Sequence, residues 1–218
     1  MKILIVSATE KEIFPLINKI NTVNQEDLTV DTLITGIGPV FTTYLLTRRL
    51  SEKDYDLVIN AGIAGSFKSE IPIGETVFVQ SDQFADLGIE DKNEFHTLFE
   101  KGFLNKDQFP FQDAKLENPY DFNLNLRKVS AITVNTTHEC NTSIDMLKQK
   151  FEADIESMEG AAFFYVCLQE GEKFLQVRTI SNFVRERNTA NWDIPLAIKN
   201  LNQKLFELID VLSKTKNS

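Results

Sequence analysis

A small polar pair near the C-terminal end of the chain follows a short strand pattern and could take part in chemistry. Ser181 and Asn182 come directly after residues 176–180, whose alternating apolar and polar side chains predict a β-strand. Arginines surround the pair in an otherwise acidic chain, at Arg178, Arg185 and Arg187. Small-molecule sites of α/β sheets lie beyond the carboxyl ends of strands. The pair could therefore bind a small polar ligand, although a simple polar turn explains this stretch at least as well.

Two glutamates stand at other predicted strand-to-helix junctions. Glu12 completes the pattern Thr9-x-x-Glu12, which predicts a capping box for a helix that runs to about residue 20. Glu159 precedes the very apolar segment 160–168, which predicts a buried helix, so we do not expect its carboxyl group to be freely exposed. A helix N-terminus favours an acid by ~0.3–1 kcal/mol. Each glutamate thus has a structural explanation, and a carboxylate displayed at the end of a strand is the functional alternative.

Alternating strands and helices are predicted to position these residues. Short apolar runs indicate buried strands, and periodic apolar segments between them indicate helices. The predicted strands are 2–7, 28–35, 57–60, 74–79, 129–135, 153–158 and 176–180, and the predicted helices are 9–20, 40–50, 144–151, 159–168 and 194–212. This order predicts a single α/β domain over residues 1–218, with a central, mostly mixed β-sheet flanked by helices.

Two of the predicted strands end in glycine-containing turns, at 36–38 and 61–66. Glycine lets the backbone approach a ligand closely. Neither turn fits a P-loop or a dinucleotide-binding fingerprint, because no Lys-Ser/Thr pair directly follows a glycine and the pattern G-x-G-x-x-G does not occur.

The segment 82–125 is expected to be irregular and carries a run of phenylalanines. Phe95, Phe99 and Phe103 have helical spacing, which predicts a short helix with one aromatic face. A local core explains such a face, and a lid over an aromatic ligand or a subunit interface is the alternative.

Composition argues against several classes of protein. Among 218 residues, 42% are apolar and 25% are charged, which is typical of a soluble globular protein. The formal net charge of −9 argues against a general nucleic-acid-binding surface or an anionic-membrane surface. Two cysteines predict no disulfide framework. No apolar run approaches the ~20 residues of a membrane span and no signal peptide is evident, so we expect a cytoplasmic protein.

Taken together, the motifs resemble one family. Glu12, the two glycine turns, Met158-Glu159 and Arg178–Asn182 stand in the order and spacing of the nucleoside phosphorylase and nucleosidase superfamily, in particular its hydrolytic branch. The resemblance spans almost the whole chain and implies a purine nucleoside phosphorylase-like fold. In nucleosidases that cleave methylthioadenosine and adenosylhomocysteine, a motif similar to Met158-Glu159 holds the ribose. A motif similar to Arg178–Asn182 ends there in an aspartate that protonates adenine, whereas this chain has Asn182.

The amide of Asn182 suits a 6-oxopurine. Adenine carries an amino group, a donor, beside N7, whereas hypoxanthine carries a carbonyl group, an acceptor. A side-chain amide offers both a donor and an acceptor, so its NH2 group can donate to O6 while its carbonyl accepts from N7–H. Leaving a buried polar partner unmatched costs ~1–3 kcal/mol, enough for strong discrimination. Asn182 therefore predicts a 6-oxopurine nucleoside as the substrate.

The combination Ser181-Asn182-Phe183-Val184-x-x-Arg187, followed by Trp192, is most similar to the futalosine hydrolase family. That family releases hypoxanthine from futalosine in the alternative menaquinone pathway. Its substrate carries a carboxylated aromatic ring, and Arg187, or in second place Arg185, is the candidate to bind the carboxylate. Neutralisation of nearby acids such as Glu186 is the alternative role for both arginines.

The resemblance implies hydrolysis of an N-ribosidic bond through an oxocarbenium-like state. The expected catalytic residues are Glu12, Asn182 and Arg178. The expected substrate-binding residues are Ala64, Gly65, Met158, Glu159, Ser181 and Arg187. Glu12 would deprotonate water with Arg178 close by, and general-base help of this kind is worth ~10²–10⁴-fold.

The resemblance also implies that no metal or organic cofactor is needed, and that the protein is a homodimer or a larger homo-oligomer. Phosphorolysis is less expected, because Glu12 would repel phosphate and because Ile63 stands where related proteins carry a serine. Three alternatives stay open at this point. They are a methylthioadenosine/adenosylhomocysteine nucleosidase, a 6-oxopurine nucleoside phosphorylase and a nucleoside-binding module without catalytic activity.

Overall fold

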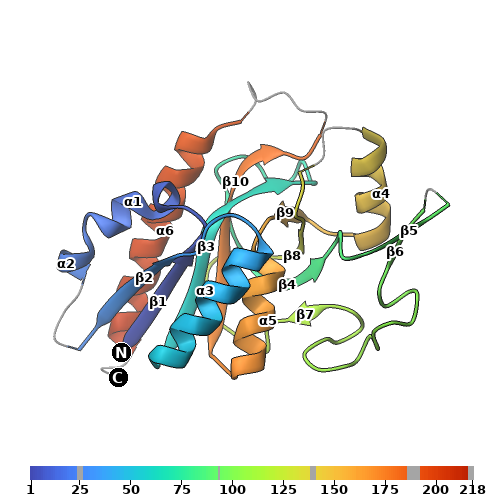
Figure 1. Ribbon diagram of the computed structural model, residues 1–218. Helices are drawn as coiled ribbons and strands as arrows, with labels where there is room; N and C mark the ends of the chain where they lie inside the picture. The colour runs from blue at the N-terminus through green and yellow to red at the C-terminus, as the bar shows by residue number, and fades with distance from the viewer. Residues whose placement is uncertain (24–26, 93, 138–140, 186–191, 216–218) are drawn as a thin grey trace.

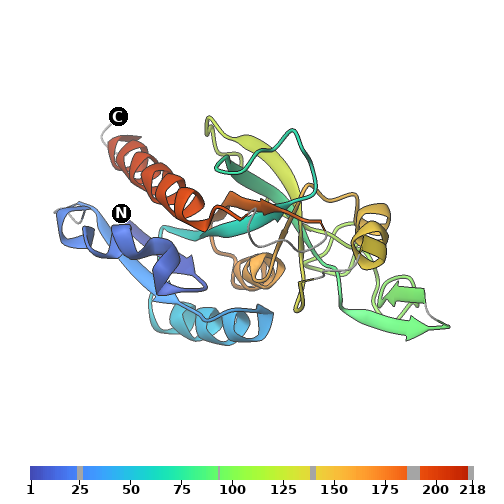
Figure 2. The ribbon, with the colours of Figure 1, turned by 90° about the horizontal axis from the view of Figure 1, so that it is seen from above.

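The computed structural model describes residues 1–23, 27–92, 94–137, 141–185 and 192–215, and helices cover both faces of its central sheet (Figure 1). Helices α3 (Pro39–Glu52) and α5 (Gly160–Glu170) pack against each other on one face. Helices α1 (Glu10–Ile17) and α6 (Ile194–Thr215) pack together on the other face, as the view from above shows (Figure 2). The remaining helices are α2 (Ile20–Val23) and α4 (Asn141–Phe151).

The sheet is mixed and partly closed on itself. Its strands are β1 (Lys2–Ser7), β2 (Thr29–Ile34), β3 (Leu57–Ser66), β4 (Thr76–Phe84), β7 (Leu116–Glu117), β8 (Arg127–Thr133), β9 (Ile155–Ser157) and β10 (Phe174–Phe183). Strand β10 is antiparallel to β4, β9 is antiparallel to β3, and β1, β2, β3 and β10 run parallel. Because β3 pairs with both β9 and β10, the strands β3, β10, β4, β8 and β9 close into a ring. The predicted α/β class, with a mixed sheet between helices, is confirmed.

Strand β1 shows why the core has two halves. Ile3 and Ile5 pack into the apolar cluster beneath α1 and α6, whereas Leu4 and Val6 pack into the cluster beneath α3 and α5. All of them are fully buried. A strand that is apolar on both sides is what a sheet covered by helices on both faces requires. This explains the unbroken apolar run at the start of the chain.

The prediction that the third strand ends at residue 60 in a glycine turn is wrong. Strand β3 continues through Ser66, because β10 offers it a parallel partner along that whole length. The glycines serve packing instead. A Cβ at Gly62 would lie 2.6 Å from Nη1 of Arg178, so only glycine lets β3 and this side chain lie so close.

The helix predicted from the phenylalanine spacing is also wrong. Phe95 lies in β6 (Glu94–Thr97), which pairs with β5 (Gly88–Asp91) in a separate antiparallel hairpin. Phe103 lies on a loop and is 67% exposed. At Gly88, a Cβ would lie 2.2 Å from the backbone oxygen of His96, so this glycine permits the close pairing that replaces the helix. None of the helices in the part of the chain that the structure describes is long and apolar enough to cross a membrane.

Candidate functional site

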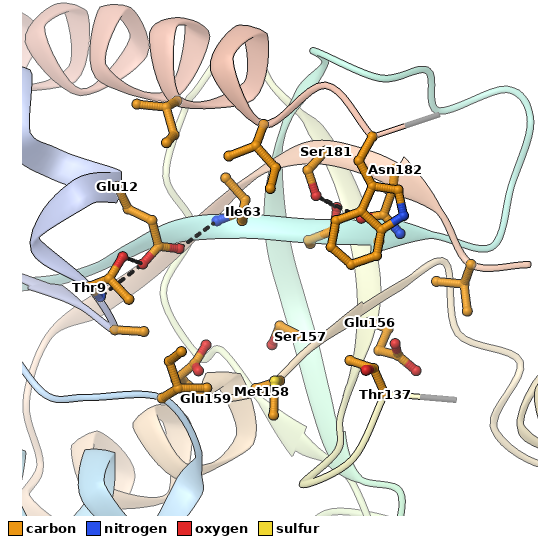
Figure 3. Close-up of a pocket in the computed structure, with 18 of the residues that line it drawn as sticks. Thr9, Glu12, Ile63, Thr137, Glu156, Ser157, Met158, Glu159, Ser181 and Asn182 are labelled. Atoms are coloured by element: carbon orange, nitrogen blue, oxygen red, sulfur yellow. Dashed lines mark hydrogen bonds between the residues drawn. The ribbon is translucent and has the colours of Figure 1, made fainter. Parts of the chain in front are cut away.

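A cavity of about 450 Å³ lies beyond the ends of β1 and β10, between β9 and the first turns of α6 (Figure 3). Its volume is in the range of small-molecule sites. Most of the predicted site residues line it, namely Glu12, Ala64, Gly65, Met158, Glu159, Ser181 and Asn182. Arg178 is not among the lining residues, and Arg187 lies outside the described residues.

Glu12 is held in one orientation by hydrogen bonds from three residues. Its Oε2 accepts from the Thr9 backbone N–H at 2.9 Å, the Thr9 hydroxyl at 2.8 Å and the Ser7 hydroxyl at 3.2 Å. Among the described residues, its Oε1 accepts a hydrogen bond from the Ile63 N–H alone, at 3.1 Å, so one lone pair of this oxygen remains for a ligand. The capping box and the display of a carboxylate are therefore compatible, because each uses a different oxygen.

Glu159 is the N-cap residue of α5 and is 7% exposed. Its Oε1 accepts from the Gly38 N–H at 3.1 Å, and its Oε2 lies 3.8 Å from Nη2 of Arg178. Gly38 has a φ of +104°, which favours glycine, and this conformation directs its N–H at the carboxylate. Burial raises the pKa of Glu159, while the guanidinium group of Arg178 and the N–H of Gly38 partly oppose that rise.

Arg178 lies behind the cavity wall, next to both acids. Its side chain is 1% exposed, and Nη2 donates a hydrogen bond to Oδ1 of Asn60. A Cβ at Gly62 would lie 2.6 Å from Nη1 of Arg178 and 3.0 Å from Oε1 of Glu12, so the cation and this carboxylate share one small region. The arrangement places a buried positive charge beside Glu12 and Glu159 without exposing it to the cavity.

Asn182 lies at the opposite end of the cavity from Glu12 and Glu159 (Figure 3). The Ser181 hydroxyl donates to Oδ1 of Asn182 at 2.7 Å. This contact assigns the amide orientation and turns Nδ2 away from Ser181. The polar pair therefore presents a fixed amide to any ligand that fills the cavity.

Several lining residues were not predicted from the sequence. Glu156, on β9, is 7% exposed, and burial, with the nearby charge of Asp86, raises its pKa to about 7. Lys11 was also not predicted and is exposed at the cavity. Arg185, the second candidate from the sequence for binding the substrate carboxylate, is exposed there too, and its guanidinium group lies 5.5 Å from the ring centre of Phe183. The sequence signal for Glu156 was an acid inside a short apolar strand pattern, just before Met158-Glu159. In the described part of the chain, no cluster of His, Cys, Asp or Glu is arranged to hold a metal ion.

The fold and the cavity define an α/β protein with a ligand site where polar side chains from β10, α1 and the β9–α5 junction converge. The sequence model of the Phosphorylase superfamily matches residues 2–213, and the chain belongs to this superfamily. The resemblance inferred from the motifs is thus confirmed.

The curated relatives of this chain include futalosine hydrolases. The chain is 29% identical over 192 residues to a futalosine hydrolase of Streptomyces coelicolor, covering 85% of this chain and 81% of the relative. It is 28% identical over 182 residues to a futalosine hydrolase of Thermus thermophilus, covering 81% of this chain and 80% of the relative.

Solved structures show the same fold. A futalosine hydrolase mutant of Helicobacter pylori has a TM-score of 0.81 at 18% identity, covering 96% of this chain and 99% of that one. A methylthioadenosine/adenosylhomocysteine nucleosidase of Colwellia psychrerythraea, in complex with adenine, has a TM-score of 0.78 at 20% identity, covering 96% and 95%.

Proposed function

We propose that this protein hydrolyses the N-ribosidic bond of futalosine, releasing hypoxanthine and dehypoxanthine futalosine for menaquinone biosynthesis. The curated relatives support this proposal, since they are futalosine hydrolases that match most of this chain. The observation that carries it is the position of Asn182, whose amide faces one end of the cavity while Glu12 and Glu159 lie at the other. An amide there matches the keto edge of hypoxanthine.

The ribose end of the site needs acceptors for sugar hydroxyl groups and a base for water. Glu159, fixed by the Gly38 N–H, accepts hydrogen bonds from the ribose hydroxyls, and Met158 packs on the sugar. Glu12 uses the free lone pair of Oε1 to orient and deprotonate water as the sugar gains oxocarbenium character. Arg178 touches neither sugar nor base in this scheme and acts as a positioning residue, because its charge opposes the rise in the pKa of Glu159 that burial causes.

Charge at the cavity favours water over phosphate as the nucleophile. Three acids line it, Glu12, Glu156 and Glu159. Within the described ranges, the lining cations are Lys11 and Arg185, and both are exposed. A phosphate dianion beside Glu12 would be repelled, whereas water would be held.

The carboxylate of the substrate needs a cation near the cavity. Arg187 was the first candidate and falls outside the described residues, so the proposal here uses Arg185. Arg185 lines the cavity beside the ring of Phe183, which suits binding of a carboxylate attached to an aromatic ring.

The proposal is tested by incubating purified protein with futalosine, inosine, methylthioadenosine or adenosylhomocysteine, with and without phosphate. Chromatography of the released base should detect hypoxanthine from futalosine alone, at a rate that does not depend on phosphate. Release of adenine would instead indicate a methylthioadenosine/adenosylhomocysteine nucleosidase. A rate that requires phosphate would indicate a phosphorylase, and binding without cleavage would indicate a nucleoside-binding module.

A further inference from the structure

Helix α1, which carries Glu12, is kinked directly after this residue. Ile13 has a φ of −118° and a ψ of 15°, a non-helical conformation, and Pro15 follows two residues later. Proline has no N–H, and its ring clashes with the carbonyl group four residues before it, so it interrupts the hydrogen bonds of a helix. In a regular α-helix the N–H of Leu16 would donate to the C=O of Glu12. At a kink such peptide groups need other partners.

The side-chain amide of Asn202, on α6, bonds to both of these groups. Its Nδ2 donates to the C=O of Glu12 at 2.8 Å, and its Oδ1 accepts from the N–H of Leu16 at 3.1 Å. Nδ2 also donates to the C=O of Ile198, one turn earlier in α6, at 2.8 Å. Exchanging the oxygen and nitrogen atoms would set a donor against an N–H and an acceptor against two carbonyl groups, so only one orientation of the amide fits. Asn202 is 2% exposed, so water does not compete for these bonds.

This amide joins Glu12 to a wall of the cavity. Helices α1 and α6 lie side by side (Figure 2), and Ile198 and Glu12 both line the cavity. Asn202 bonds to the backbone of both residues. Donors on neighbouring segments fix the carboxylate end of the Glu12 side chain. Asn202 therefore fixes the backbone end of the same side chain.

Loss of the amide would change the conformation of α1 at the kink. The C=O of Glu12 and the N–H of Leu16 would lose their shared partner, and unpaired buried peptide groups are costly. The two groups can pair with each other if the helix closes at the kink, as in a regular α-helix. Closing the helix would move the backbone of Glu12. A displacement of ~1 Å at a catalytic group can cost ~100-fold in rate.

We propose that Asn202 is a positioning residue for Glu12. Its amide takes the place of a hydrogen bond within α1 and holds the backbone of the proposed base at a fixed place relative to α6. Asn202 does not line the cavity, so it acts through Glu12 and not on the ligand. This inference rests on the role of Glu12 in the proposed function and deepens it, and it does not depend on which purine the site binds.

The test is a double-substitution cycle, measured as kcat on futalosine. Asn202→Ala should lower kcat ~10–100-fold. The affinity for hypoxanthine should stay the same, because Asn182 lies at the other end of the cavity. In a Glu12→Gln background, which has lost the base, Asn202→Ala should cause no further fall in kcat, since residues that act as a unit are not additive. An unchanged kcat in Asn202→Ala, or the same fold loss in both backgrounds, would overturn the proposal.

Asn200, on the same helix, is the matched control. Its Nδ2 donates to the C=O of Gly74 at 2.8 Å, so this side chain also ties α6 to a backbone carbonyl group, but not to α1. It is partly buried and does not line the cavity. Asn200→Ala should therefore keep the kcat of the unaltered protein. A loss as large as that of Asn202→Ala would show that any loosening of α6 slows the reaction, which would overturn a specific role for Asn202.

Amide hydrogen exchange of the unaltered protein does not depend on how the variants fold. The N–H of Leu16 should exchange as slowly as those of the buried turns of α6, because its partner is a buried side chain. Fast exchange at Leu16 in the folded protein would overturn the bridge. If the unaltered protein releases adenine from methylthioadenosine instead of hypoxanthine from futalosine, the proposed function fails, and the same cycle on that substrate still decides the role of Asn202. Binding without cleavage would defeat both.

Discussion

Asn182 and Glu12, at the two ends of the cavity, are oriented by different sets of hydrogen bonds. Ser181 fixes the amide of Asn182 through one hydroxyl, at 2.7 Å. Glu12 is fixed by donors from Ser7, Thr9 and the Ile63 backbone, yet keeps one acceptor site on Oε1. The chemistry that we propose therefore uses side chains whose orientation is set before any ligand binds.

Replacement of Glu12 by glutamine should remove the base and leave the capping contacts in place, because the amide oxygen still accepts hydrogen bonds. The kcat on futalosine should fall ~10²–10⁴-fold while the affinity for hypoxanthine stays the same. Glu10→Gln, at an exposed position in the same helix turn, is the matched control and should keep full activity. A Glu12→Gln variant that retains its kcat would exclude Glu12 as the base.

Asn182→Asp should shift the site away from keto purines, because a carboxylate cannot donate to O6. Loss of a matched buried hydrogen bond costs ~1–3 kcal/mol, so kcat/KM for futalosine should fall ~5–150-fold. Steady-state assays on futalosine and methylthioadenosine measure the shift. Unchanged rates on both substrates would remove Asn182 from the site.

Arg185→Ala should raise the KM for futalosine and leave the affinity for hypoxanthine unchanged, because the free base has no carboxylate. An exposed charged contact is worth ~0.2–1 kcal/mol, so the expected change in KM is about 1.4- to 5-fold. A matched control is Arg127→Ala, an exposed arginine at the start of β8 that does not line this cavity. Equal KM values for Arg185→Ala and the control would leave the substrate carboxylate to another group.

At the scale of elements, a buried polar cluster supports the junction of β4, β8, β10 and α5. Asp82 is fully buried, and its Oδ1 accepts from the Thr133 hydroxyl at 2.9 Å. A Cβ at Gly160 would lie 2.0 Å from Oδ2 of Asp82, so α5 begins directly over this carboxyl group. Burial raises the pKa of Asp82 from the ordinary 3.8 to about 7. The folded state therefore prefers the protonated acid at pH values where the unfolded chain has lost the proton.

Because the pKa of Asp82 is raised in the folded state, this group makes the protein less stable as the pH rises. The stability associated with the proton is fully present below pH 3.8 and is lost as pH rises to about 7. Asp82→Asn should abolish this loss, since its amide is neutral at every pH. The side chain at this position lies against the amide of Gln176, whose Oε1 has no hydrogen-bond partner among the described residues.

Thermal unfolding measures the effect. The midpoint of Asp82→Asn minus that of the unaltered protein should grow between pH 5 and pH 8 by at least ~2–4 °C, the shift that about 1 kcal/mol produces at this size. Asp145→Asn, an exposed acid on α4, is the control and should show no such trend. A difference that stays constant with pH would show that Asp82 is ionised in the folded protein.

Most strands and helices could be located from the sequence. In β1, α5 and α6, for example, the pattern of apolar residues fits only one type of element. Prediction from the sequence failed where one sequence pattern is compatible with two kinds of local structure. Phenylalanines three or four residues apart fit a helix, but a hairpin satisfies the backbone around Phe95. Glycines 62 and 65 read as a turn, although they are strand residues that make room for Arg178 and for the cavity. Glu156 was missed because burial of an acid in a three-residue strand depends on distant segments.

At the scale of the whole molecule, apolar side chains on α3 are exposed in the part of the chain that the structure describes. Val40, Phe41 and Tyr44 are 72%, 59% and 64% exposed, and Leu87 lies in the same hollow as Val40 and Tyr44. Large exposed apolar patches mark interaction sites. We propose that a second copy of the chain covers this surface. The contact would border the cavity, since Ile37 lines the cavity and is 54% exposed beside α3.

Light scattering after size-exclusion chromatography should give a mass of twice 24.9 kDa or more. The double substitution Val40→Asp and Tyr44→Asp should lower the mass to that of one chain, because charges buried at an apolar interface are costly. Met146→Asp, an exposed apolar position on α4, is the control and should keep the larger mass. A single-chain mass for the unaltered protein would contradict the proposed assembly.

A crystal structure with bound hypoxanthine would show whether Asn182 contacts the keto group of the base. We expect the base to lie in the cavity with Nδ2 of Asn182 at 2.7–3.2 Å from O6, and with Glu12 and Glu159, at the ribose end, making no contact with it. A base bound elsewhere, or bound with its keto group turned away from Asn182, would show that Asn182 does not select the substrate.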